Sequence, residues 1–490
     1  MSEETNEAMP EPTADAVAVA AASESAPEVA GPVPDAAATV DGGSDAPEAA
    51  EPEAAPEKRA EADAAAEEPE EDAKPVVAIR RQSIVLRSGA CDMRVGPGVT
   101  DQIGNAAKTV AGKPGSVMLL HGDDVSAELV ETVRRSLVDQ GFSKVAIQSV
   151  VAGRAARTLA EASRLYTKLA DANITPDDPI VVVGDADVLS LAVFVGSTWQ
   201  TGASVVALPT TLDGMVDVTV TPRPLDSATT PEVLRARGNL RYAICDTDLL
   251  PAPSSETSLM ANAVMVAGAM AAGEANFSDL ALRADGIMEG DAATLVDEVL
   301  DITKARTRVA SSTALAVRQS ILYGLSVGRA LKACLAEQDA TDDRLAVEAD
   351  VSDARLLAEG LRISARLAAA RQATDESVVD LVFAQDGLLE RLGLPEVACN
   401  VSAERLIEAL RADEFSHSNR FMLALPLGYG RVRLNTVEDE MLSEHLGAWC
   451  RARKKLARRR AKAAVAAANQ DASPTEATEA PAPEIGDKAE

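Results

Sequence analysis

The fold is decided by residues 179–214, which read PIVVVGDADVLSLAVFVGSTWQTGASVVALPTTLDG. Residues 179–187 contain an apolar run that closes in the turn GDAD, and residues 203–211 contain a second run that closes in PTT. Short, continuous apolar runs that end in turns predict strands buried on both faces of a sheet. Ligands on parallel sheets bind beyond the carboxyl ends of the strands, so these two turns predict a ligand site.

The stretch before this one shows the same alternation. Strand-like runs cover 116–122 and 144–153, and helical periodicity covers 126–141 and 154–172. Strands separated by helices of this length predict right-handed crossovers and a mostly parallel sheet. The sequence therefore predicts an α/β fold whose N-terminal part is a Rossmann-like parallel domain over residues 76–251.

After about residue 254 the strand pattern gives way to the three-to-four spacing of helices. Helical segments are predicted at 260–273, 291–312, 315–338, 351–372 and 403–413, and a strand hairpin at 420–434. The sequence therefore predicts a mainly helical C-terminal domain over residues 252–450. A cleft between the two domains would be a common location for a ligand.

Charge is concentrated at the two ends of the chain. The formal net charge is −30, and residues 1–75 hold 21 Asp or Glu against Lys58, Arg59 and Lys74. A segment rich in Ala, Pro and like charges buries too little apolar surface to fold, so residues 1–75 are predicted to be a disordered acidic arm. Residues 451–490 are predicted to be a basic helix end followed by a disordered tail.

The basic run RARKKLARRRAK (451–462) contains eight basic residues and has three interpretations. It could be a solvated helix end, because cations are favoured near a helix carboxyl terminus. It could be a patch for nucleic acid or an anionic membrane, although the run lacks aromatic residues and the chain is acidic overall, which disfavours nucleic acid. It could also be a surface onto which the acidic arms fold.

The remaining composition predicts a cytoplasmic protein without a membrane segment. Five cysteines lie far apart and form no CxxC pair, which is typical of reduced thiols rather than of a disulfide framework or a structural zinc site. No basic residue precedes Lys58 and no apolar stretch resembles a signal peptide. The apolar run 260–272 is too short to span a membrane.

Several short motifs resemble, in their order and spacing, those of the 3-dehydroquinate synthase family. PIVVVGDAD stands where that family has GGGVVGD, and ALPTTLDGMVDVTV stands where it has PTTL followed by VDSSVGGKT. LRYAICDTDLL stands where the family has AVLADLDTL, YGLSVGRALK where it has FGHTFGHAIE, and LLERLGLP where it has GLP. The resemblance covers about residues 76–450. It implies a dehydroquinate synthase-like fold, an NAD- and zinc-dependent cyclase of the shikimate pathway, a phosphosugar acid as substrate, and a dimer.

The resemblance places the cofactor against two turns, and the residues concerned are Gly184, Asp185, Thr210, Thr211 and Asp217. Small residues let a backbone approach a pyrophosphate, whereas Asp185 brings negative charge towards it. The alternative is that PTT is an ordinary turn at the end of a strand. NAD binding is therefore left open.

The resemblance also predicts that the metal site is lost. The three zinc ligands of the family fall at Ala263, Leu325 and Asp353, and a further histidine falls at Arg329. The chain has three histidines, none at a ligand position: His121, His417 and His445. A catalytic zinc needs three protein ligands, so we predict that zinc is absent and assign no catalytic residue.

The family's substrate lysines are replaced as well. Arg223 stands at the lysine of the family's GGK motif. Arg157 stands at a family position near the cofactor, and Arg329 at one near the metal. The lysines of the family's DKK motif are replaced by Glu414 and Phe415. Arginine binds phosphate bidentately, so Arg157, Arg223 and Arg329, together with Arg154, could form a pocket for an anionic metabolite. The alternative is that they are solvated surface residues.

Three functions follow. The chain could be a catalytically degenerate homologue that binds or regulates; it could be a working, divergent synthase; or it could be an interaction platform that captures a protein partner through its charged termini. The first is preferred, because a zinc enzyme that loses its Lewis acid loses several kcal/mol of transition-state stabilisation.

Overall fold

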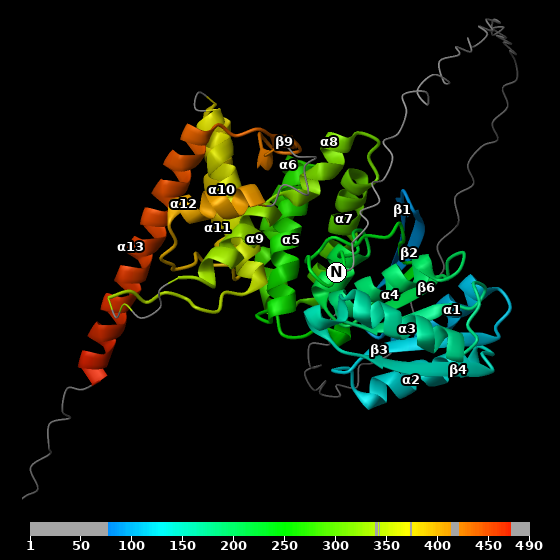
Figure 1. Cartoon of the computed structure of the whole chain (residues 1–490). Coiled ribbons are helices and arrows are strands. Elements are labelled where there is room, and N and C mark those ends of the chain that lie inside the picture. The colour runs from blue at the N-terminus through cyan, green and yellow to red at the C-terminus, as the bar shows by residue number, and fades with distance from the viewer. Residues whose placement is uncertain (1–76, 339–341, 343, 373–374, 413–420, 472–490) are drawn as a thin grey trace, which may run out of the picture. The chain divides into compact units, whose positions relative to one another are not determined.

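The computed structural model describes residues 77–338, 342, 344–372, 375–412 and 421–471 (Figure 1). The predicted acidic arm, the end of the predicted tail, Glu414, Phe415 and His417 lie outside the described residues. None of the described helices is long and apolar enough to cross a membrane.

A seven-stranded sheet forms the α/β part, in the order β1-β2-β7-β6-β5-β3-β4. Its strands are β1 (Arg80–Leu86), β2 (Gly89–Gly96), β3 (Ser116–Gly122), β4 (Lys144–Val150), β5 (Ile180–Gly184), β6 (Val205–Pro209) and β7 (Tyr242–Asp246). Only β1 and β2 pair antiparallel, and the other neighbours are parallel. The predicted parallel α/β fold is confirmed.

Three of the four helices of this part begin at side chains that cap them. The four helices are α1 (Ile103–Ala111), α2 (Ala127–Asp139), α3 (Leu159–Asp171) and α4 (Ala186–Thr198). Ser126, Thr158 and Asp185 accept hydrogen bonds from backbone N–H groups in the first turns of α2, α3 and α4. The helix predicted over 154–172 therefore begins only at Leu159, after its Thr158 cap.

The register of β5 and β6 brings the two turns of the opening stretch together. Gly184 lies opposite Pro209, and the N–H of Thr210 donates to the carbonyl of Gly184 at 2.9 Å. The turn GDAD and the turn PTT thus leave the sheet side by side at its carboxyl edge. This is the edge at which parallel sheets bind ligands.

The rest of the described chain is mainly helical, as predicted (Figure 1). Its helices are α5 (Glu256–Ala272), α6 (Glu274–Glu289), α7 (Ala292–Ala310), α8 (Leu315–Arg318), α9 (Leu325–Leu335), α10 (Asp353–Arg371), α11 (Glu376–Arg391), α12 (Ala403–Ala412) and α13 (Asp439–Asp471). The antiparallel hairpin of β8 (Leu423–Pro426) and β9 (Val432–Asn435) lies within the predicted segment. The domain boundary at 251/252 stays a prediction.

The helix predicted over 315–338 is interrupted, and the cause is tertiary. Gly324 has a φ of 79°, and a Cβ there would lie 2.8 Å from Leu361 Cδ2. A Cβ on Gly360 would lie 2.0 Å from the carbonyl oxygen of Gly324. The start of α9 therefore approaches α10 so closely that only glycines fit, and the left-handed Gly324 is the residue from which α9 begins.

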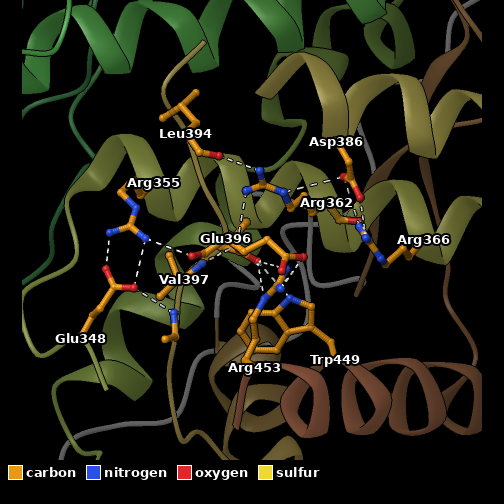
Figure 2. Close-up of polar contacts among 12 residues, drawn as sticks. Glu348, Arg355, Arg362, Arg366, Asp386, Leu394, Glu396, Val397, Trp449 and Arg453 are labelled. Atoms are coloured by element: carbon orange, nitrogen blue, oxygen red, sulfur yellow. Dashed lines mark hydrogen bonds and ion pairs between the residues drawn. The ribbon is translucent and has the colours of Figure 1, made fainter. Parts of the chain in front are cut away.

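A buried polar network around Glu359 of α10 holds α13 in place (Figure 2). The indole N–H of Trp449 and the guanidinium of Arg453 donate to Glu359 Oε2 at 3.0 and 2.9 Å. The N–H of Val397 donates to Glu359 Oε1 at 2.9 Å, and Arg362 donates to the carbonyl of Leu394 at 2.6 Å. Buried charges are stable only when paired in this way.

The basic run of α13 is divided between two faces. Arg453 is 3% exposed, and Arg460 donates to Glu348 Oε1 at 2.5 Å, so both face the body of the protein. Five basic residues are exposed on the other side of the helix: Arg451, Lys455, Arg458, Arg459 and Lys462. The run is therefore not wholly solvated, because part of it carries the docking of α13.

Candidate functional site

The N-terminus of α4 is occupied by the side chain of Asp185. Asp185 Oδ1 accepts from the N–H groups of Asp187 and Val188 at 2.9 and 2.8 Å, and Oδ2 accepts from the N–H of Gly153 at 2.6 Å. Burial raises the pKa of Asp185, and these hydrogen bonds oppose the rise. A carboxylate of the chain thus lies where an anionic ligand would lie at a free helix N-terminus.

Arg223 lies among three aspartates that come from the two turns. It contacts Asp213 at 2.7 Å, Asp217 at 3.2 Å and Asp187 at 3.3 Å. Burial raises the pKa of Asp213 and Arg223 opposes the rise, whereas the three aspartates outweigh burial and raise the pKa of Arg223. The cation at the family's lysine position is therefore engaged inside the chain.

A second group of charges lies beside the first. Arg157, which is buried, contacts Asp187 at 2.6 Å and Glu232 at 3.7 Å. Arg154 and Arg329 also contact Glu232, at 3.6 and 3.3 Å. The predicted arginines thus converge, and Glu232 is the carboxylate that they share.

Arg306 of α7 joins the helical part to this network. It is 6% exposed and donates to Asp217 Oδ1 at 2.6 Å and to Thr221 Oγ1 at 3.1 Å. Burial lowers its pKa, and Asp217 opposes the change. Its Nε is buried and makes no hydrogen bond within the described part of the chain.

These charges line a cleft of about 220 Å³. Its wall has seven cationic side chains and four acidic ones, together with aliphatic residues of α5, α9 and α10. The charged residues are Arg154, Arg157, Arg223, Arg235, Arg306, Arg329, Lys332, Asp187, Asp217, Glu232 and Asp353. The cleft therefore has a surplus of positive charge together with an apolar side.

The predicted residues divide between the cleft and the turns. Arg157, Arg223, Arg329 and Asp217 line the cleft. Gly184, Asp185, Thr210 and Thr211 are not among its lining residues, and Thr211 Oγ1 instead accepts from the N–H of Gly214 at 3.3 Å. The last four residues belong to the packed ends of β5 and β6.

The positions of the family's zinc ligands do not offer a set of metal donors. Ala263 is buried in α5, and Leu325 is an aliphatic residue of the cleft wall. Asp353 is the one carboxylate at these positions, and it accepts a hydrogen bond from Lys332 Nζ at 2.5 Å. Within the described ranges no three His, Cys, Asp or Glu side chains gather as metal ligands. The donor set does not fit catalytic zinc, which needs three protein ligands.

The turn before α4 does not fit a dinucleotide either. A diphosphate at a helix N-terminus accepts from free backbone N–H groups. Two N–H groups of the first turn of α4, those of Asp187 and Val188, already donate to Asp185, and so does the N–H of Gly153 from the segment before α3. The carboxylate would also repel the diphosphate.

Comparison with known proteins agrees with this architecture. Residues 147–224 match the family model described as 3-dehydroquinate synthase N-terminal. A 3-dehydroquinate synthase of Xanthomonas campestris pv. campestris is 27% identical over 354 residues, which are 71% of this chain and 92% of that protein. One of Pelotomaculum thermopropionicum is 26% identical over 360 residues, with 72% and 92% covered.

The chain is a divergent 3-dehydroquinate synthase-like protein. Its fold is shared with solved structures of two synthases. A 2-deoxy-scyllo-inosose synthase complexed with carbaglucose-6-phosphate, NAD⁺ and Co²⁺ has a TM-score of 0.63 at 15% identity, over 75% of this chain and 99% of that one. A 2-epi-5-epi-valiolone synthase from Streptomyces hygroscopicus subsp. jinggangensis 5008, with NAD⁺ and Zn²⁺ bound, has a TM-score of 0.58 at 13% identity, over 72% and 95%.

Sequence reasoning missed the residues that neutralise the arginines of this 3-dehydroquinate synthase-like protein. Asp213 lies in the predicted turn after residues 203–211, Glu232 lies in a stretch for which the sequence predicts no element, and Arg306 lies in the helix predicted at 291–312 from periodicity alone. One signal was available for Asp213, since it belongs to the turn PTTLDG at a strand end. No local signal marks Glu232 or Arg306, because their partners are distant in the sequence.

Proposed function

We propose that this protein has lost the zinc-dependent cyclisation of its family and that it binds a small anionic metabolite in the cleft. The observation that carries the proposal is the state of Asp353, the one carboxylate at a family ligand position. It is paired with Lys332, the other two ligand positions hold Ala263 and Leu325, and Arg329 stands at the family's further histidine. A metal ion placed there would have a guanidinium and an ammonium beside it.

The chemistry of the cleft supports binding of an anion. Guanidinium groups recognise carboxylate and phosphate bidentately, and the cleft has more of them than it has carboxylates. Arg329 is one of these guanidinium groups, and it donates to Glu232 at 3.3 Å. An incoming carboxylate or phosphate would compete with Glu232 for it.

The aliphatic side of the cleft supports an organic ligand rather than an inorganic ion. Leu325, Leu356 and Leu357 line the cleft together with the arginines. A ligand with one or two acidic groups and a carbon body satisfies both sides. The seven-carbon phosphosugar acid of the family has this composition, and we propose it, or a relative of it, as the ligand.

Two experiments test the proposal. The chain should fail to restore growth on minimal medium to a strain that lacks dehydroquinate synthase; restored growth would favour the divergent-synthase alternative. Calorimetric titration with the seven-carbon phosphosugar acid should show binding without phosphate release, about tenfold weaker in Arg329→Gln, a loss of about 1.4 kcal/mol. The matched control is Arg458→Gln, on the exposed face of α13, which should bind like the wild type.

A further inference from the structure

A second cavity, larger than the cleft, lies on the other side of the segment that contains Arg223. Its volume is about 400 Å³. The wall comes from the β1–β2 turn, from α4, from residues 220–223 and 234–238, and from the ends of α7 and α8. It shares Thr221, Pro222, Arg223 and Arg235 with the cleft, so these residues separate the two cavities.

Every charged residue that lines this cavity is an arginine: Arg87, Arg223, Arg235, Arg237 and Arg318. No acidic residue is among its lining residues, in contrast to the cleft. Like charges held around one cavity repel one another, and the cost falls when an anion enters. This arrangement is therefore that of a site for a strongly charged anion.

The arginines are not equivalent, and three of them are available. Arg223 is engaged by its aspartates, and Arg318 Nη1 donates to the carbonyls of Ser312 and Thr313 at 2.6 and 2.9 Å. Arg87, Arg235 and Arg237 make no hydrogen bond or ion pair with a side-chain carboxylate in the described part of the chain. These three come from two separate segments and meet only at the cavity.

The rest of the wall indicates what the anion is attached to. Hydroxyl groups come from Ser88 and Ser190, and apolar surface comes from Val193, Phe194 and Leu234. Ser190 Oγ accepts from the N–H of Arg223 at 3.0 Å, which fixes the shared wall. A bare inorganic ion would leave the apolar part of a cavity of about 400 Å³ unfilled.

We propose that this arginine cavity binds a small phosphorylated metabolite, with the phosphate held by Arg87, Arg235 and Arg237. The guanidinium fork matches phosphate oxygens in pairs, which a cavity with several convergent arginines exploits. This site does not depend on the function proposed for the cleft. Arg87 and Arg237 line the arginine cavity and not the cleft, and Arg235 lines both.

The test is calorimetric titration of the full chain with inorganic pyrophosphate as the probe, at low and at physiological salt. The wild type should bind, and the double variant Arg87→Gln/Arg237→Gln should bind at least about tenfold more weakly. Arg329→Gln, in the cleft, and Arg458→Gln, on α13, should bind like the wild type. Unchanged melting temperatures show that the variants are folded.

Three results would overturn the proposal. They are absence of binding by the wild type, equal binding by the wild type and the double variant, and loss of binding in Arg329→Gln with retention in the double variant. The last result would place the anion in the cleft instead. A sugar phosphate titrated in parallel should bind more tightly than inorganic phosphate if the apolar wall contributes, and equal affinities would contradict the assignment of an organic ligand.

Discussion

Replacing Asp185 by glycine should open the N-terminus of α4 to a dinucleotide. In the wild type three backbone N–H groups donate to the Asp185 carboxylate at 2.6 to 2.9 Å. Asp185→Gly frees these donors and removes a negative charge from the place where a diphosphate would lie. We therefore expect the variant to bind NAD more tightly than the wild type does.

The size of the gain can be bounded. Two unit charges about 4 Å apart interact by about 4 kcal/mol at an effective dielectric constant of about 20, and solvent reduces this at a site open to a ligand. A gain of at least about 1.4 kcal/mol, which is a tenfold tighter Kd, is therefore expected. The loss of the cap should cost only a few tenths of a kcal/mol, because glycine is tolerated at the N-cap.

The assay is calorimetric or fluorescence titration of NAD into both proteins at neutral pH. Asp185→Asn is the control, because it removes the charge but keeps a side chain over the N–H groups. It should show a smaller gain than Asp185→Gly. If Asp185→Gly melts like the wild type and binds NAD no more tightly, the carboxylate is not what opposes the dinucleotide.

Four further predictions follow from the network and the pKa directions. Burial raises the pKa of Asp185, so any affinity of the wild type for NAD should increase as the pH falls towards that raised pKa and the carboxylate is neutralised. Titrations of Asp185→Gly should show no such trend. Glu359→Gln removes the carboxylate that Arg453 and Arg362 share, although Arg453 keeps Glu396 and Arg362 keeps Asp386. The variant should therefore lower the free energy of unfolding by about 1.5–3 kcal/mol in urea titrations, against about 1 kcal/mol for Trp449→Phe; equal losses would mean that the charge is unimportant. Burial raises the pKa of Glu348, but hydrogen bonds from Arg355 and others outweigh burial, so the pKa is lowered on folding. The stability that the Glu348 carboxylate adds is therefore present above its unfolded pKa and is lost as the pH falls through the lower folded pKa. The destabilisation by Glu348→Gln at pH 7 should accordingly shrink in unfolding curves below pH 4. Changing the exposed basic residues of α13 to glutamine should alter the free energy of unfolding by less than about 0.5 kcal/mol per residue, whereas Arg453→Gln should destabilise strongly. Similar melting temperatures for the two kinds of variant would contradict the two-faced docking of α13. The exposed residues are Arg451, Lys455, Arg458, Arg459 and Lys462.

The docking of α13 decides how the interaction-platform alternative can be tested. Removing residues 451–490 would also remove Arg453 and Arg460, which dock α13. A loss of partner capture would then report misfolding as readily as a lost surface. Substitution of the exposed face alone keeps the docking residues and isolates the effect of charge.

The parallel strands were predictable because they are continuous apolar runs that end in turns, as at Ile180–Gly184 and Val205–Pro209. The edge hairpin of β1 and β2 was not predicted, since Arg80–Leu86 mixes exposed polar and apolar residues and has no clear period. The break before α9 could not be predicted either. Its cause is the contact of Gly324 with Leu361, which no local pattern reveals.

The candidate site was also predictable from the sequence only in part. The family resemblance brought Arg157, Arg223 and Arg329 into one group, and the structure places all three on one cleft. The sequence could not show that aspartates and Glu232 already engage them, because the pairing depends on three-dimensional distance. Asp185 was expected to oppose a pyrophosphate by its charge; the structure adds that it occupies the donors.

The central claim is that the zinc chemistry of the family is lost, and it is tested most directly by one assay on purified full-length protein. The protein is loaded with excess zinc, passed through a desalting column, analysed for bound metal, and then given NAD and the seven-carbon phosphosugar acid while phosphate release is recorded. The account predicts zinc far below one ion per chain and no phosphate release above the enzyme-free rate. One zinc per chain together with catalytic phosphate release would contradict it.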